Sequence, residues 1–122
     1  MVKEIGDMKN FNLSEFACPC CGKNNMQDSF LLRLDKVRGL AGIPFVINSG
    51  CRCVAHNKAV GGSKTSSHLN GLAADISAKT SSQKFWILIG LMFAGFNRIG
   101  IAKDFIHVDN DPTKAEDVLW TY

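Results

Sequence analysis

Three side chains in this chain of 122 residues have the types and spacing needed to bind a catalytic metal ion. His68 is followed seven residues later by Asp75, and His107 lies in the segment Asp104-Phe-Ile-His107-Val-Asp109. Two imidazoles and one carboxylate are the ligands expected of a catalytic zinc ion, which takes three protein ligands and leaves a fourth position for water. The sequence therefore predicts a zinc site formed by His68, Asp75 and His107.

Two further residues could assist hydrolysis at such a site. Activated water must lose a proton and the leaving amine must gain one, and a nearby carboxylate commonly carries that proton. Asp104 is a candidate base, but strand side chains alternate between faces, so it shares a site with His107 only if the chain bends or bulges between them. Arg52 is a candidate for holding a substrate carboxylate or stabilising an oxyanion.

Helical segments that could position these residues follow from the spacing of apolar residues. From Asp28 to Ala41 they recur at steps of one, three and four residues, which predicts an amphipathic helix. A second helix is predicted to begin with Ser81 or Ser82 as its cap and to stop at Gly95. Shorter helical segments are predicted at Asn12–Phe16 and Cys51–Val60. The residues of the second long helix expected in the core are Phe85, Trp86, Ile89 and Phe93.

Short apolar segments predict strands, most of them in the second half of the chain. These segments are Phe45–Ile47, Gly71–Ser77, Ile99–Ile101 and Phe105–Val108. The order of elements favours an α+β fold with a small antiparallel sheet and flanking helices. No linker or repeat interrupts the sequence, so we expect residues 1–122 to form a single domain.

Charge and hydropathy argue against two classes of partner. The chain has 14 Lys and Arg against 11 Asp and Glu, and its net charge of +3 is scattered, whereas nucleic-acid binders usually cluster positive charge. The longest apolar segment, Phe85–Phe96, contains two glycines and is too short to cross a bilayer. Met1–Asn10 has no apolar core, so we expect no secretory signal and synthesis in the cytoplasm.

The five cysteines fall into two groups and cannot all pair with one another. The groups are Cys18, Cys20 and Cys21, then Cys51 and Cys53. Clustered thiols in a reducing compartment bind metal or stay free more often than they form disulfides. Cys18 and Cys21 have the spacing of a zinc knuckle, which Cys51 or Cys53 could complete as a structural site. Free thiols or one disulfide between the groups are favoured over this second ion.

Several motifs of the chain, taken together, are similar to those of one enzyme family. The motifs are Ser49-Gly-Cys-Arg52, His56-Asn57, Val60-Gly-Gly62, Ser66-x-His68-x-x-Gly71-x-Ala73-x-Asp75 and Phe105-Ile-His107-Val-Asp109. They resemble the M15 family of zinc peptidases, which includes D-alanyl-D-alanine carboxypeptidases and phage L-alanyl-D-glutamate endolysins. The resemblance runs from about Phe11 to Tyr122.

The resemblance implies the Hedgehog/DD-peptidase fold, with zinc in a groove over an antiparallel sheet. It implies His68, Asp75 and His107 as zinc ligands, Asp104 as general base and Arg52 in contact with the substrate or the transition state. Ser66 either hydrogen-bonds the substrate or fixes its loop, and both roles stay open. The family usually has an aromatic residue at the position of Cys51, a departure that alters the wall of the site without touching its ligands.

The expected function is hydrolysis of peptide bonds in the stem peptides of bacterial peptidoglycan by a zinc enzyme. Aspartate rather than glutamate at position 104 resembles the endolysin branch and favours an endopeptidase over a carboxypeptidase. The alternative is a non-catalytic zinc-binding module that recognises cell wall or a partner protein. We expect a monomer that acts on the wall after release from the cell, without nucleic-acid or membrane partners.

Overall fold

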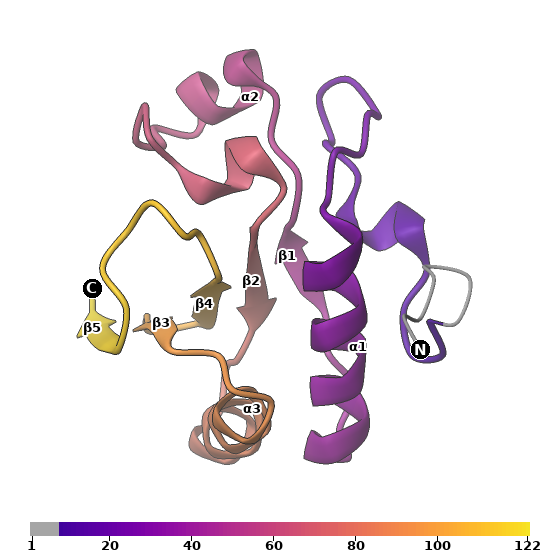
Figure 1. Cartoon of the computed structure of the whole chain (residues 1–122), viewed down its shortest axis with the longest axis vertical. Coiled ribbons are helices and arrows are strands. Elements are labelled where there is room, and N and C mark those ends of the chain that lie inside the picture. The colour runs from indigo at the N-terminus through magenta and orange to yellow at the C-terminus, as the bar shows by residue number, and fades with distance from the viewer. Residues whose placement is uncertain (1–7) are drawn as a thin grey trace.

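The computed structural model describes residues 8–122 and combines helices with one five-stranded sheet. The elements are a 3-10 helix at Leu13–Phe16, α1 (Asp28–Ala41), β1 (Ile47–Ser49), α2 (Val54–Ala59), a 3-10 helix at Ser67–Asn70, β2 (Ala73–Ser77), α3 (Ser81–Phe93), β3 (Arg98–Ile101), β4 (Phe105–Asp109) and β5 (Val118–Thr121). Figure 1 shows α1 and α3 beside the sheet, with α2 and its neighbouring loops at one end. The predicted α+β class is confirmed.

The sheet has the strand order β1-β2-β4-β3-β5. Its first four strands pair antiparallel, as predicted, but β5 pairs parallel with β3, so the sheet is mixed. The sequence did not predict β5, because its pairing with β3 is a long-range contact that no local pattern encodes. Without this strand the C-terminal residues would not reach the sheet face described below.

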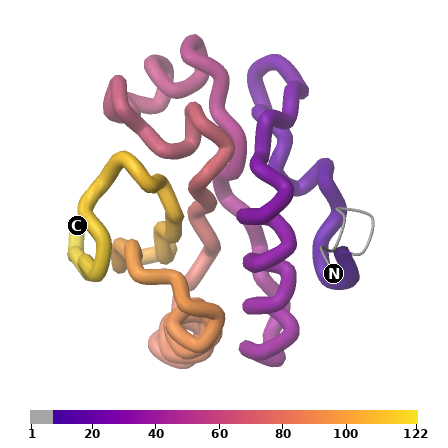
Figure 2. The backbone as a smooth tube through the Cα atoms, in the orientation of Figure 1, coloured from indigo at the N-terminus to yellow at the C-terminus, as the bar shows by residue number. Residues whose placement is uncertain are grey.

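Side chains alternate strictly between two faces of the sheet. On one face the central strands contribute Ala74, Ile76, Ile106 and Val108 to a core shared with α1 and α3. On the other face the same strands carry polar residues that line a pocket. The path of the chain in Figure 2 places the loops around α2 and the C-terminal segment beside this second face. The sheet therefore separates a packed core from a polar groove.

The buried face of α3 differs from the one predicted. Phe85 and Phe93, expected in the core, are 55% and 80% exposed, whereas Ile87 and Leu91 are buried. Apolar residues surround this helix on every side, so their spacing does not select one face. Gly90 determines which face of α3 packs against α1, because a Cβ at this position would lie 3.0 Å from a methyl group of Val37.

The remaining core predictions for α3 also need correction. Trp86 is 45% exposed, and Ile89 is only partly buried. The cap is Thr80 rather than Ser81 or Ser82, and its hydroxyl accepts a hydrogen bond from the backbone N–H of Gln83. Gln83 completes the capping box by accepting from the Thr80 N–H. A capping box needs Glu or Gln three residues after the cap, and neither Ser81 nor Ser82 is followed by one at that position.

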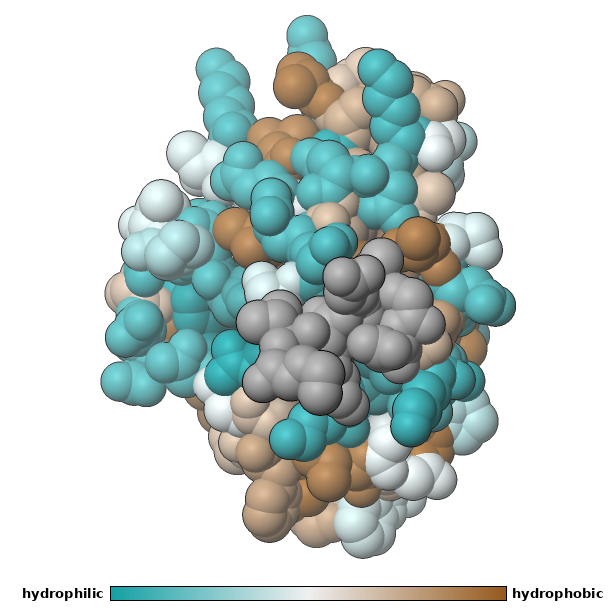
Figure 3. Space-filling view, turned by 45° about the vertical axis from the view of Figure 1, so that its right-hand side comes forward, coloured by the Kyte–Doolittle hydropathy of each residue, from teal (hydrophilic) through white to brown (hydrophobic). Residues whose placement is uncertain are grey.

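Two other predictions are that the chain has no membrane partner and no secretory signal. Hydrophilic residues are spread over the face seen in Figure 3, with small apolar patches between them. Among residues 8–122, no helix combines the length and hydropathy needed to cross a membrane. The predicted absence of a secretory signal rests on Met1–Asn10, most of which lies outside the described residues.

Candidate metal centre

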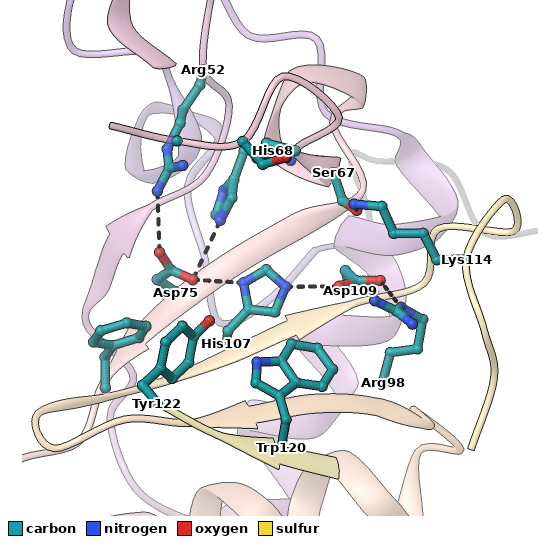
Figure 4. A pocket seen from close by; sticks show the side chains of 14 residues that line it. Arg52, Ser67, His68, Asp75, Arg98, His107, Asp109, Lys114, Trp120 and Tyr122 are labelled. Atoms are coloured by element: carbon teal, nitrogen blue, oxygen red, sulfur yellow. Dashed lines mark hydrogen bonds and ion pairs between the residues drawn. The ribbon is translucent and has the colours of Figure 1, made fainter. Parts of the chain in front are cut away.

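The sheet and one adjacent turn bring His68, Asp75 and His107 together. Asp75 lies in β2 directly opposite His107 in β4, and His68 projects from the 3-10 helix that precedes β2 (Figure 4). One ligand atom from each residue lies within 4.8 Å of the other two. The antiparallel register thus supplies two of the three groups, and the turn before β2 supplies the third.

A glycine makes the turn between His68 and β2 possible. Gly71 ends the 3-10 helix with a φ of 68°, a left-handed conformation that side chains with a Cβ rarely adopt. A Cβ at this position would also lie 2.1 Å from the backbone oxygen of Asn25. The chain therefore turns tightly after His68 and enters β2 in register with Asp75.

The His68 imidazole is oriented by the backbone. Its Nδ1 lies 2.7 Å from the carbonyl oxygen of Gly50, and a carbonyl can only accept, so Nδ1 carries the proton. The unprotonated Nε2 then faces Asp75, 3.3 Å from Oδ1. This tautomer presents a lone pair where a metal ligand needs one.

The His107 imidazole is oriented by a carboxylate. Its Nε2 lies 2.7 Å from Oδ2 of Asp109, which is itself buried and bound by Arg98 at 2.6 Å. Nε2 therefore donates to Asp109, and Nδ1 faces Oδ1 of Asp75 at 2.9 Å. Histidine ligands of metals commonly donate their second ring N–H to a carboxylate in this way. Asp109 therefore holds the His107 imidazole in its orientation.

The electrostatics of the three groups favour a bound cation. Burial alone would raise the pKa of Asp75 and lower that of His107. Hydrogen bonds with His107 and His68 outweigh burial and hold the pKa of Asp75 below its ordinary range. Hydrogen bonds to Asp109 and Asp75 likewise raise the pKa of His107. Two nitrogens and one carboxylate oxygen, all aimed at the same small space, are a donor set that fits Zn²⁺.

Arg52 lies at the edge of this centre. Its Nη2 is 3.4 Å from Oδ2 of Asp75, the oxygen that does not face the two histidines. Ser49 accepts from Nε at 3.0 Å, and the buried Asn57 accepts from Nη1 at 3.3 Å. Asn57 in turn donates to the backbone oxygen of Ser63. The α2 helix thus positions Arg52 through Asn57.

Ser66 caps the 3-10 helix that carries His68. Its hydroxyl accepts from the backbone N–H of His68 at 3.2 Å, and the residue also lines the pocket. The loop-fixing role predicted for Ser66 is therefore present in the structure, and its position leaves the hydroxyl within reach of a bound molecule.

The structure does not bring Asp104 to the metal ligands. This residue is exposed in the turn between β3 and β4 and is not among the residues that line the pocket. Strand β4 pairs with β2 from Phe105 to Asp109 in one continuous register. The chain bends at Lys103 and Asp104, just before this strand begins, so the register does not fix the side to which Asp104 is directed, and its assignment as general base stays a prediction.

The pocket over the centre has a volume of about 380 Å³ and includes residues that the sequence analysis did not assign to it. Among them are Ser63, Ser67, Arg98, Phe105, Lys114, Trp120 and Tyr122. Arg98 and Phe105 share the sheet face of His107, so strand alternation could have identified them. Trp120 and Tyr122 reach the pocket because β5 joins the sheet.

Trp120 and Tyr122 form the aromatic side of the pocket. The Trp120 ring lies 5.6 Å from that of His107 and packs over Gly100, where a Cβ would lie 2.4 Å from the indole nitrogen. Figure 4 shows the Tyr122 hydroxyl directed toward the contact between Asp75 and His107. Partial burial and the negative charge of Asp75 raise the pKa of Tyr122, so its phenol stays protonated at neutral pH and can donate a hydrogen bond.

A second group of potential ligands lies outside the pocket. The sulfurs of Cys18, Cys21 and Cys53 lie within 4.8 Å of one another, whereas Cys51 is buried in the core and does not belong to the group. All five cysteines are free thiols. Of the two candidates for completing the Cys18 and Cys21 pair, the structure thus favours Cys53.

A comparison with protein families gives a match. A family model described as Peptidase M15 matches residues 9–109. The matched range contains all the candidate metal ligands and Arg52, and it ends at Asp109, before β5. No curated protein matches the sequence.

Proposed function

The chain belongs to the peptidase M15 family, and from that premise we propose that it is a zinc-dependent peptidase acting on the stem peptides of bacterial peptidoglycan. The observation that carries this proposal is the convergence of His68, Asp75 and His107 on one side of a pocket. Three protein ligands with an open fourth side are typical of catalytic rather than structural zinc. Hydrolysis between L-Ala and D-Glu is the favoured reaction, ahead of release of terminal D-Ala.

The ligand geometry indicates how such a site would work. Zinc bound there would polarise the substrate carbonyl and make water acidic enough to attack at neutral pH. His68 and His107 would supply neutral nitrogens, because Gly50 and Asp109 accept the protons of their other ring nitrogens. These hydrogen bonds would hold both rings in the binding orientation throughout the reaction.

The charged groups around the pocket suit an anionic substrate. Arg52, Arg98 and Lys114 line it, and stem peptides carry free carboxylates that guanidinium groups bind well. Arg52 is the cation beside Asp75, so we assign it to the substrate carboxylate or the developing oxyanion. The protonated Tyr122 hydroxyl is a second donor on the same side of the pocket.

One observation favours a second candidate function, a non-catalytic zinc module that binds cell wall or a partner protein. Hydrolysis needs a proton acceptor, and Asp104 lies outside the pocket. The two carboxylates that line the pocket are both engaged, Asp75 with the histidines and Asp109 with His107 and Arg98. A module of this kind would bind peptidoglycan in a zinc-dependent manner and release no product.

The test is incubation of zinc-loaded protein with purified peptidoglycan, followed by mass spectrometry of the released fragments. A chelated sample and the variant His68→Ala serve as inactive controls, and His56→Ala, which changes a histidine outside the site, should behave as wild type. New N-terminal D-Glu would establish an endopeptidase, and D-Ala alone a carboxypeptidase. Zinc-dependent binding without product would support the module, and neither binding nor product would overturn both proposals.

We further propose that the protein is a monomer, is made in the cytoplasm and reaches the wall after release from the cell. The scattered net charge of +3 supports approach to an anionic polymer over a specific nucleic-acid contact. Light scattering of the purified protein tests the monomeric state, which a dimer mass would contradict.

A further inference from the structure

The thiols of Cys18, Cys21 and Cys53 have the arrangement of a metal site that the hydrolytic function does not use. Their sulfurs lie within 4.8 Å of one another, although they come from two segments far apart in the sequence. Tetrahedral zinc with Zn–S bonds of about 2.3 Å places neighbouring sulfurs about 3.8 Å apart. Small side-chain adjustments would therefore close the observed cluster around one ion.

A tight loop presents the first two thiols. Residues Cys18 to Lys23 form it, with the Cys18 N–H donating to the Lys23 carbonyl and the Gly22 N–H donating to the Cys18 carbonyl, both at 2.8 Å. Gly22 has a φ of 73°, which favours glycine at this point of the loop. In Figure 1 this loop follows the Leu13–Phe16 segment and lies alongside the chain that enters α2, where Cys53 is located.

The Cys18 sulfur is buried and accepts a hydrogen bond from the backbone. The Cys53 N–H lies 3.4 Å from this sulfur. Metals bind the thiolate form, and hydrogen bonds to the sulfur are typical of thiolate ligands.

Cys20 is the remaining thiol of the same loop. It is exposed and lies outside the compact group of three sulfurs, so it would reach the ion only through a change in its side-chain conformation. Cys51 is excluded, because its side chain is buried in the core.

We propose that Cys18, Cys21 and Cys53, with Cys20 as the fourth ligand, bind a structural zinc ion separate from the groove. A site with four thiolates leaves no position for water, so it would have no part in hydrolysis. Its effect would be to connect the Cys18–Lys23 loop to the segment that carries Arg52. The same segment is already joined to this region by the Cys51 N–H, which donates to the Phe16 carbonyl at 2.8 Å.

The consequence is support for the Arg52 segment and for α2. Cys53 caps α2 through its sulfur, which accepts from the His56 N–H at 3.4 Å. A helix of six residues has little stability of its own and depends on such contacts. Loss of the thiol-bound ion would therefore loosen α2 and, through Asn57, the position of Arg52.

Metal counting in the reduced, zinc-loaded protein tests the proposal. We expect two zinc ions in wild type, one in Cys21→Ser and one in His68→Ala. The control Cys51→Ala removes a thiol outside the cluster and should retain both ions. With cobalt in place of zinc, the thiolate-to-cobalt charge-transfer band should persist in His68→Ala and disappear in Cys21→Ser.

Because a cysteine variant could fail to fold, a second measurement uses wild type alone. Zinc should slow alkylation of Cys20, Cys21 and Cys53 by N-ethylmaleimide at least tenfold, and a chelator should restore the rate. Equal rates with and without zinc, or a single zinc ion in wild type that disappears in His68→Ala, would overturn the proposal. The latter result would leave the proposed groove site intact, so the two proposals fail separately.

Discussion

The groove centre and the cysteine cluster differ in what positions their ligands. In the groove, two ligands lie opposite each other in the register of β2 and β4, and hydrogen bonds to Gly50 and Asp109 orient both imidazoles. In the cluster, all sulfurs come from loops or from the start of a short helix. The groove is therefore largely formed before metal arrives, whereas the cluster depends on its ion to hold the loops together.

The two regions would use zinc differently, the groove for catalysis and the cluster for stability. A preformed site with a pocket on its open side can bind and release substrate without losing the ion. A site closed by thiolates contributes to stability, because metal binding is coupled to ordering of the ligand loops. The following changes are expected to affect the two regions unequally.

The largest effect is expected from His68→Ala. Loss of this ligand should lower the affinity of the groove for zinc by more than about 100-fold. Losing a residue that only supports a ligand lowers metal affinity by up to about 100-fold, and His68 would bind the ion directly. Zinc-dependent hydrolysis should fall to background, as measured by fragment release from peptidoglycan. Wild-type activity in this variant would show that His68 is not a zinc ligand.

Arg52→Ala comes next. Its guanidinium lies beside Asp75 but does not bind the ion, so the variant should keep zinc and lose roughly 100-fold in kcat/KM. Steady-state kinetics on a synthetic stem peptide measure this, with Arg52→Lys expected to recover only part of the rate because lysine lacks the bidentate geometry. Unchanged kinetics in Arg52→Ala would place the substrate elsewhere.

Asp109→Asn tests how the groove orients its ligand. The carboxylate accepts from His107 and pairs with Arg98, so its loss should weaken zinc binding about 10-fold to 100-fold. Competition with a chromophoric chelator measures the affinity of the groove, and the cobalt–thiolate band should stay unchanged. A loss confined to that band would contradict the assignment of Asp109 to the groove.

A smaller effect is expected from pH on the metal-free protein. The pKa of folded His107 is raised above its ordinary value of 6.5, so its ion pairs with Asp75 and Asp109 stabilise the fold below that value. This contribution is lost as pH rises through the raised pKa. Thermal unfolding of the chelated protein should therefore shift to lower temperature across that interval, and the His107→Ala variant should lack the shift.

The smallest effect is expected from Asp104→Ala. Because this side chain is exposed outside the pocket, the variant should keep its zinc and change kcat/KM by less than about threefold. Abolished hydrolysis with zinc still bound would show that the β3–β4 turn reaches the groove during the reaction, against the geometry described here.

Local patterns predicted the elements that carry the ligands. The apolar period of α1 and the short apolar segments of β2 and β4 placed a helix and two strands correctly, and His68 and Asp75 are close in sequence. The face of α3 required knowledge of its contact with α1 at Gly90, which is a tertiary feature. The choice of Cys53 over Cys51 likewise depends on how a loop packs against a distant segment.

The parts of the site that sequence could not supply come from long-range pairing. Trp120 and Tyr122 enter the pocket only because β5 joins β3 in parallel, a pairing that no local pattern encodes. Asp104 would share a site with His107 only if the chain bends before or between them. The structure has a bend at Lys103 and Asp104, and β4 begins after it at Phe105, so the predicted role of Asp104 as base stays a prediction.

The central claim is that the groove holds a zinc ion that cleaves peptidoglycan peptides. The most direct test compares the fragments released from peptidoglycan by metal-free and zinc-loaded wild-type protein. The account predicts new N-terminal D-Glu only in the zinc-loaded sample, and its absence when His68→Ala is used instead. Identical fragments with and without zinc would contradict the account.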